Sequence, residues 1–217
     1  MAGMKDCCEI RTDIPDRQRR VLQIVLWINA AMFLAEFGAG VLAHSTALIA
    51  DSVDMLGDAI VYGFSLYVVA RGAAWQAKAA LLKGAIMATF GVGVLAEVAL
   101  KIARGVVPSA DLMSAVGFVA FAANVFCLGL LARRREDDIN MRSAWVCSRN
   151  DVVANVGVLL AAGAVALTGS AWPDILMGLL IATLFGTSAI GVIRGARREL
   201  ERPVPVLVAP RVPGTSE

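Results

Sequence analysis

Long apolar stretches, separated by short polar ones, dominate the pattern of residues along this chain. Six such stretches are each long enough for a helix that crosses a bilayer, which needs about 20 apolar residues. They cover approximately residues 21–43, 46–70, 81–103, 112–132, 143–168 and 175–193. The alternating segments of about ten residues that are typical of a membrane β-barrel are absent. The pattern therefore predicts an all-α membrane protein, a bundle of six transmembrane helices.

Composition and charge refine this prediction. Of the 217 residues 58% are hydrophobic, whereas soluble domains have roughly half. Lys and Arg flank one set of helix ends, at residues 17–20, 71–78, 133–142 and 194–202. Because these residues accumulate on the cytoplasmic side of membranes, both termini are predicted to be cytoplasmic. An even number of spans agrees with that orientation. We expect a multi-pass protein of the inner (plasma) membrane.

The polar ends of the chain bound a single membrane domain. Residues 1–20 are expected to be a cytoplasmic N-terminal arm, 21–199 the transmembrane domain, and 200–217 a short cytoplasmic tail. The arm holds Cys7 and Cys8, which can capture a soft metal only as an incomplete site. No phosphate-binding Gly-rich loop and no nucleophile–base pair is found, which argues against ATP-driven pumping and against an enzyme. We expect no cofactor and no nucleic-acid partner.

Three carboxylates lie in the second apolar stretch. Asp51, Asp54 and Asp58 follow steps of three and four residues, which places them on one stripe of a helix. Each costs about 2.5–3.5 kcal/mol inside a membrane, and together they repel one another unless protonated or shared by a cation. The alternative is pairing with basic residues of neighbouring helices, for which the candidates are Lys83, Lys101 and Arg149.

The fifth stretch offers partners for these acids. Cys147 and Asp151 are four residues apart, the same spacing that separates Asp54 and Asp58. Facing each other, the two pairs present three carboxylates and one thiolate, a set that suits tetrahedral zinc. The sulfur disfavours magnesium and calcium, which prefer oxygen ligands, and it admits cadmium. The metal is expected as a transported substrate.

Two segments carry a resemblance to a known family. Residues 45–59 (STALIADSVDMLGDA) and 142–160 (RSAWVCSRNDVVANVGVLL) are similar to the second-helix and fifth-helix motifs of the cation diffusion facilitator family. Its members are metal–proton antiporters with six spans. The resemblance extends over about residues 20–199 and places the ligand positions on Asp54 and Asp58 with Cys147 and Asp151. It also implies a homodimer that exports metal from the cytoplasm.

Two departures from the family pattern stand out. Cys147 occupies the position where the fifth helix usually has histidine, which affects the choice of metal. The family's C-terminal cytoplasmic domain has no counterpart in residues 200–217, so a short form of the family is expected.

Further polar residues stand in the apolar stretches. Asp51 is not a ligand position in the family pattern; it is either a proton carrier or first acceptor of the metal, or a hydrogen-bonded structural acid. Glu36 and Asn155 are candidates for a proton pathway or for supporting the ligands. For Asn29 and Asn155, hydrogen bonding between helices is the favoured alternative. His44 is expected to be solvated in an extracytoplasmic turn.

The ligand chemistry predicts a mechanism. Metal ligands must be deprotonated, so binding a cation expels protons and protonation releases it. We therefore expect export of zinc, or alternatively cadmium, by proton antiport. A passive metal channel without proton coupling and a membrane metal-binding sensor remain alternatives. An organic-cation exporter would need more aromatic residues near the acids than Tyr62 and Trp145, and a metalloprotease would need an open coordination position.

Overall fold

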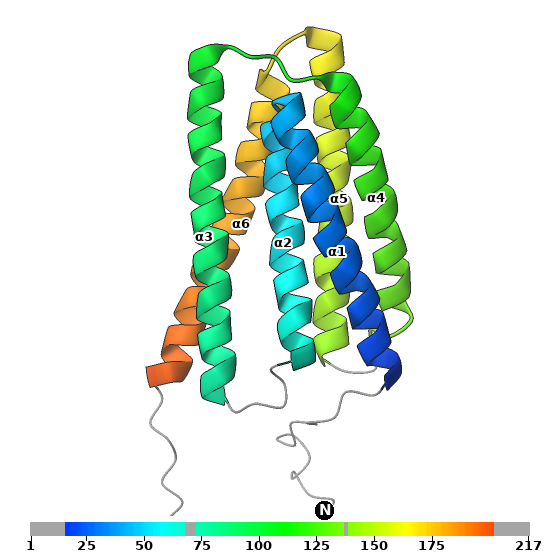
Figure 1. Cartoon of the computed structure of the whole chain (residues 1–217), viewed down its shortest axis with the longest axis vertical. Helices are drawn as coiled ribbons and strands as arrows, with labels where there is room; N and C mark the ends of the chain where they lie inside the picture. The colour runs from blue at the N-terminus through cyan, green and yellow to red at the C-terminus, as the bar shows by residue number, and fades with distance from the viewer. Residues whose placement is uncertain (1–15, 68–72, 137–138, 202–217) are drawn as a thin grey trace, which may run out of the picture.

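The described part of the computed structural model, residues 16–67, 73–136 and 139–201, contains six helices and no strand. The helices are α1 (Asp16–Ala43), α2 (Thr46–Tyr67), α3 (Ala73–Arg104), α4 (Ala110–Ala132), α5 (Ile139–Thr168) and α6 (Trp172–Glu201). They run alternately up and down, so the start of α1 and the end of α6 lie at the same end of the bundle (Figure 1). The predicted all-α bundle is confirmed, and the cytoplasmic location of the termini stays a prediction.

The helices extend beyond the predicted apolar stretches. α1 begins at Asp16, inside the predicted arm 1–20, and α6 continues to Glu201, at the start of the predicted tail 200–217. This is expected physically, because apolar residues mark only the part of a helix inside hydrocarbon, while its backbone hydrogen bonding continues past the bilayer. Cys7, Cys8 and residues 202–217 lie outside the described residues.

Five of the described helices are long and apolar enough to cross a membrane, and α2 is not among them. The physical reason is its charge, because Asp51, Asp54 and Asp58 all lie within its 22 residues. α2 is nevertheless the central helix of the bundle, in contact with α1, α3, α5 and α6. These neighbours surround the acids, so α2 is accommodated as the sixth helix of the bundle although it carries three carboxylates. The outer surface is apolar, with Leu167 89% exposed, as expected for a face toward lipid.

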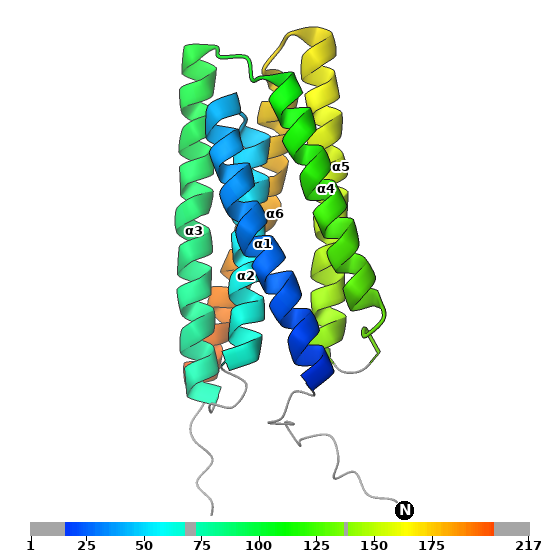
Figure 2. The same ribbon diagram turned by 45° about the vertical axis from the view of Figure 1, so that its right-hand side comes forward.

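Three helix pairs build the bundle. α1 packs against α2, α4 against α5, and α3 against α6. α3 and α4 lie on opposite sides of the bundle (Figures 1 and 2). Contacts of α1 with α4 and of α2 with α5 join two of these pairs into a four-helix unit. The buried residues of α4 recur at steps of three and four, as in helices that pack along a seam. They are Met113, Gly117, Ala120, Asn124, Cys127 and Leu131.

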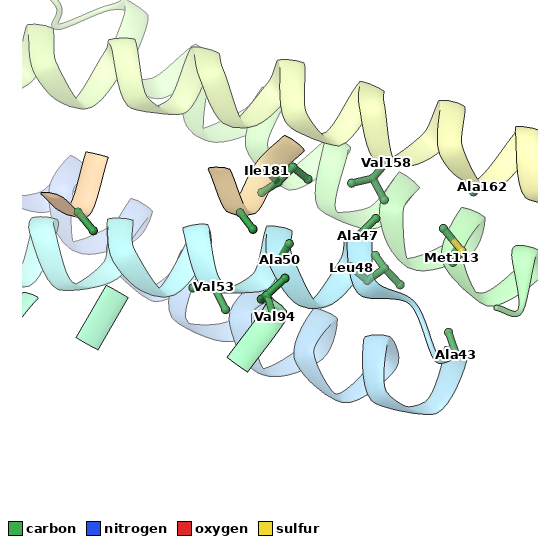
Figure 3. Packing of buried hydrophobic residues seen from close by; sticks show 12 residues of the cluster. Ala43, Ala47, Leu48, Ala50, Val53, Val94, Met113, Val158, Ala162 and Ile181 are labelled. Carbon is green, nitrogen blue, oxygen red and sulfur yellow. The ribbon is translucent and has the colours of Figure 1, made fainter. Parts of the chain in front are cut away.

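Apolar clusters close both ends of this unit. Near the turn between α1 and α2, buried apolar side chains pack together, among them Ala47, Leu48, Met113 and Val158 (Figure 3). Toward the other end a second cluster gathers around Tyr62. The acids of α2 lie between these clusters along the helix. Ala50 and Val53 belong to the first cluster and Tyr62 to the second, so the segment 51–58 is packed inside the bundle.

Candidate functional site

The three acids of α2 are enclosed to different degrees. The side chains of Asp51 and Asp58 are buried, with 1% and 7% exposure, and Asp54 is half-buried. Asp58 accepts a hydrogen bond through Oδ2 from the Tyr62 hydroxyl at 2.7 Å. Since a helix advances 3.6 residues per turn, the steps of three and four keep all three carboxylates on the interior face of α2.

α5 brings its own acid to the same region. Asp151 is buried, and its carboxyl group interacts electrostatically with those of Asp58, Asp54 and Asp51. Asp54 is near enough for a hydrogen bond between the two carboxyl groups. Cys147 lies one turn before Asp151 on the same helix and is half-buried. The α2 and α5 residues singled out in the sequence thus lie in one polar region.

Two further side chains reach this region, and neither was predicted as part of it. The hydroxyl of Tyr62 interacts electrostatically with Asp58, Asp151 and Cys147. The thiol of Cys127, on α4 and fully buried, interacts with Asp151 and Asp58. The signal for Tyr62 was its position one turn after Asp58. The signal for Cys127 was its place on the seam of α4.

The acids do not form a compact metal cage. Within residues 16–67, 73–136 and 139–201, no three His, Cys, Asp or Glu side chains are placed so that they could hold one metal ion. Ionised carboxylates repel each other, which favours such separation. The set Asp54, Asp58, Cys147 and Asp151 therefore stays a prediction, and these side chains would have to converge on a cation.

A second pair of acids lies beside the first. Glu36 of α1 and Asp51 of α2 are 0% and 1% exposed, and their carboxyl groups are close enough to interact. Within the described residues, none of their four oxygens accepts a hydrogen bond from the backbone or from any side chain other than the paired carboxyl group. Two buried carboxyl groups in this arrangement are stable when they share a proton or a cation. Among the described residues, Glu36 is the group placed to hydrogen-bond with Asp51, so its interpretations as a proton carrier, as a first acceptor of the metal and as a structural acid all stay predictions.

The buried asparagines bond within their own helices. The side-chain amides of Asn29 and Asn155 each donate to the backbone carbonyl four residues earlier, of Val25 and Asp151, at 2.9 Å. These donors thus do not bridge helices, contrary to the favoured alternative. Their side-chain oxygens have no partner among the described residues. Asn155 therefore presents a polar oxygen one turn from Asp151.

One of the proposed basic partners is engaged elsewhere. Lys101 of α3 forms a buried ion pair with Asp174 of α6, at 2.5 Å between Nζ and Oδ2. It also donates to the backbone carbonyl of His44. The same Asp174 carboxylate caps the start of α2, where its donors are the Ser45 hydroxyl (2.5 Å) and the backbone N–H groups of Thr46 (2.8 Å) and Ala47 (3.2 Å). Lys101 is therefore not the partner of the α2 acids.

Two other basic residues and the histidine were also singled out in the sequence. The Arg149 guanidinium is exposed and lies over the Trp145 ring, 5.5 Å from its centroid. The side chain of Lys83 lies outside the described residues. His44 is exposed, as predicted, and ends α1 with a left-handed backbone (φ 53°).

Comparison with known proteins places most of the chain in one family. Residues 22–200 match the family model of the cation efflux transmembrane domain. The metal cation efflux system protein CzcD of Cupriavidus metallidurans is 24% identical over 181 residues, which cover 78% of this chain and 57% of that protein. The zinc transporter ZitB of Escherichia coli is 27% identical over 205 residues, covering 88% of this chain and 65% of that protein. The matches thus span less than two thirds of each relative.

Proposed function

Because the chain belongs to the cation efflux family, also called the cation diffusion facilitators, we propose that it exports a divalent transition metal by exchange for protons. It is a multi-pass protein of the inner (plasma) membrane. In this proposal the protein binds a metal ion on one side of the membrane and releases it on the other, as its binding site changes exposure from one side to the other. It makes or breaks no covalent bond.

The observation that carries the proposal is the meeting of acids from two helices. Asp151 of α5 interacts with Asp54 and Asp58 of α2 in the interior of a bundle whose outside is apolar. Buried carboxylates of like charge are costly inside a membrane and mark ion pathways. A divalent cation between the two helices would neutralise them, with Cys147 as the fourth ligand.

Zinc is the proposed substrate, with cadmium as the second candidate. Three oxygens and one sulfur match the tetrahedral coordination that zinc adopts. A thiolate ligand favours soft and borderline metals over magnesium and calcium. The names of the two relatives agree with this choice of substrate, since one names zinc and the other a metal cation. The Cys147 ligand is the feature that would admit cadmium.

Proton exchange follows from the same ligands. Carboxylates and a thiolate bind metal only when deprotonated, so a metal ion and protons compete for them. Glu36 and Asp51 offer a neighbouring pair of buried carboxyl groups whose oxygens, among the described residues, have no hydrogen-bond partner outside the pair. We propose that this pair accepts protons on their way to or from the metal ligands, and that Asn155 lines the same route. A homodimer is also proposed, on family likeness.

Transport into proteoliposomes tests the proposal. Purified full-length chain, reconstituted with an imposed pH gradient, should accumulate Zn²⁺ and move protons in the opposite direction. Metal flux of equal rate with and without the gradient would instead indicate a passive channel. Metal binding without any flux would indicate a sensor. Either result would overturn proton antiport.

A further inference from the structure

Tyr62, which is not one of the predicted metal ligands, has a defined hydrogen-bond partner in the polar region. Its hydroxyl donates to Asp58 Oδ2 at 2.7 Å, and both residues lie on α2, one turn apart. The side chain of Tyr62 is 1% exposed, among the largest fully buried side chains of the described residues. A buried phenol needs a hydrogen-bond partner, and here the partner is a predicted metal ligand.

The Tyr62 ring is fixed by the helices around it. It packs in an apolar cluster to which α1, α4 and α5 all contribute buried side chains. The other members are Leu22, Val25, Cys127, Leu131, Met141 and Ala144. Because close-packed interiors restrict side-chain rotation, the hydroxyl is presented in one direction. The donor that meets Asp58 is therefore held in a fixed position.

The hydroxyl also faces the α5 half of the region. It interacts electrostatically with Asp151 and Cys147 as well as with Asp58. Tyr62 thus lies where the ligand pairs of α2 and α5 approach each other. Its hydroxyl holds Oδ2 of Asp58, the predicted ligand of α2 nearest to it along the helix.

We propose that Tyr62 is a positioning residue that orients Asp58 for metal binding. This inference rests on the proposed function, because it requires Asp58 to be a ligand. Groups that hydrogen-bond to metal ligands fix their orientation, and their loss typically lowers metal affinity 10- to 100-fold. The alternative is a purely structural hydrogen bond that satisfies the phenol and does not affect metal binding.

Removal of the hydroxyl alone separates these two roles. Tyr62→Phe keeps the ring and its packing but deletes the donor to Asp58. The matched control is Thr183→Val, which removes a hydroxyl from the exposed face of α6, where it bonds only to the Leu179 carbonyl. Asp58→Asn serves as the variant that lacks the ligand. All are measured as full-length protein in lipid nanodiscs, by Zn²⁺ titration and by the visible absorption of bound Co²⁺.

We expect Tyr62→Phe to weaken Zn²⁺ binding by roughly 10- to 100-fold. We also expect it to change the Co²⁺ spectrum at saturation, because Asp58 then coordinates in a different orientation. Thr183→Val should match the wild type in both. Equal affinity and an identical Co²⁺ spectrum in Tyr62→Phe would overturn the positioning role while leaving the metal site intact. A wild type that binds no metal, or an Asp58→Asn that binds equally well, would overturn the proposed function and this inference together.

A second measurement covers the case in which Tyr62→Phe does not fold. Fluorotyrosine at position 62 keeps both the ring and the hydroxyl, and its ¹⁹F resonance reports on the hydrogen bond. We expect the resonance to shift in step with Zn²⁺ binding in the wild-type background, and to stay unmoved in Asp58→Asn. A resonance that does not respond to bound Zn²⁺ would contradict the proposal.

Discussion

Two groups of buried carboxylates in this protein differ in their surroundings. Asp174 is fully buried, pairs with Lys101, and accepts three hydrogen bonds at the start of α2. Glu36 and Asp51 are buried as deeply, but within the described residues their oxygens have no basic partner and no hydrogen-bond donor other than each other's carboxyl group. The same chemical group is therefore satisfied in one place and open to an exchangeable partner in the other.

We propose that this difference separates structural from functional acids. Burying a carboxylate costs free energy unless hydrogen bonds and an opposite charge compensate it. Asp174 has this compensation built into the fold, where it joins α3 and α6 to the start of α2. The carboxyl groups of Glu36, Asp51 and Asp151 lie close to other acids, Asp54 among them, and we propose that protons or a metal ion stabilise them.

The largest expected effect is at the proposed metal ligands. Asp58→Asn or Asp151→Asn removes a negative charge that the cation needs, so transport of Zn²⁺ should be abolished. The protein should remain folded and inserted, because neutral amides are less costly in the bundle than buried anions. Zn²⁺ uptake into membrane vesicles, with size-exclusion profiles of the purified variants, checks both points. Retained transport in either variant would refute the ligand set.

The next effect concerns stability at Asp174. Asp174→Asn leaves the Lys101 ammonium buried without its anion, which should lower the free energy of unfolding by about 3–5 kcal/mol. Asp51→Asn, the matched change at a buried acid without a basic partner, should alter it by about 1 kcal/mol or less, because no ion pair is broken and an amide can still hydrogen-bond to Glu36. Thermal unfolding in one detergent compares the two. Equal losses of stability would erase the distinction between the two groups of acids.

A smaller effect is expected for the pair beside the metal ligands. Glu36→Gln combined with Asp51→Asn removes two proton acceptors and keeps the predicted metal ligands. Zn²⁺ affinity should therefore change little, while fewer protons move per metal ion transported. Parallel records of Zn²⁺ and a pH-sensitive dye in proteoliposomes give this ratio. An unchanged ratio would assign the protons to the ligands alone.

The smallest expected effect is on the choice of metal. Cys147→His replaces a soft thiolate by an imidazole, so the ratio of cadmium to zinc transport should fall by a factor on the order of ten, about 1.4 kcal/mol in relative binding. Competition between the two ions in one vesicle preparation measures this ratio directly. If the substitution left it unaltered, the sulfur would not be a ligand.

The fold was largely predictable, because apolar stretches of membrane length determine the number and type of helices. The acids of α2 and α5 were also visible in the sequence, since a spacing of four residues places two side chains on one helix face. The ion pair of Lys101 with Asp174 was not, because 73 residues separate the partners and only the packing of α3 on α6 joins them.

The contribution of α4 was missed for a related reason. Cys127 is a single thiol in a mostly apolar helix, where it resembles any small hydrophobic residue. Only the contact of α4 with α5 shows that it faces Asp151. Likewise, Tyr62 was noted only as an aromatic residue near the acids, because the sequence does not show to which acceptor its hydroxyl donates.

The central claim is that carboxylates of α2 and α5 bind a transported metal in exchange for protons. It is tested most directly by recording proton release from proteoliposomes as Zn²⁺ is added, for the wild type and for Asp151→Asn. We predict Zn²⁺-dependent proton movement in the wild type and none in the variant. Proton movement of equal size in both, or Zn²⁺ flux without any proton movement in the wild type, would contradict the claim.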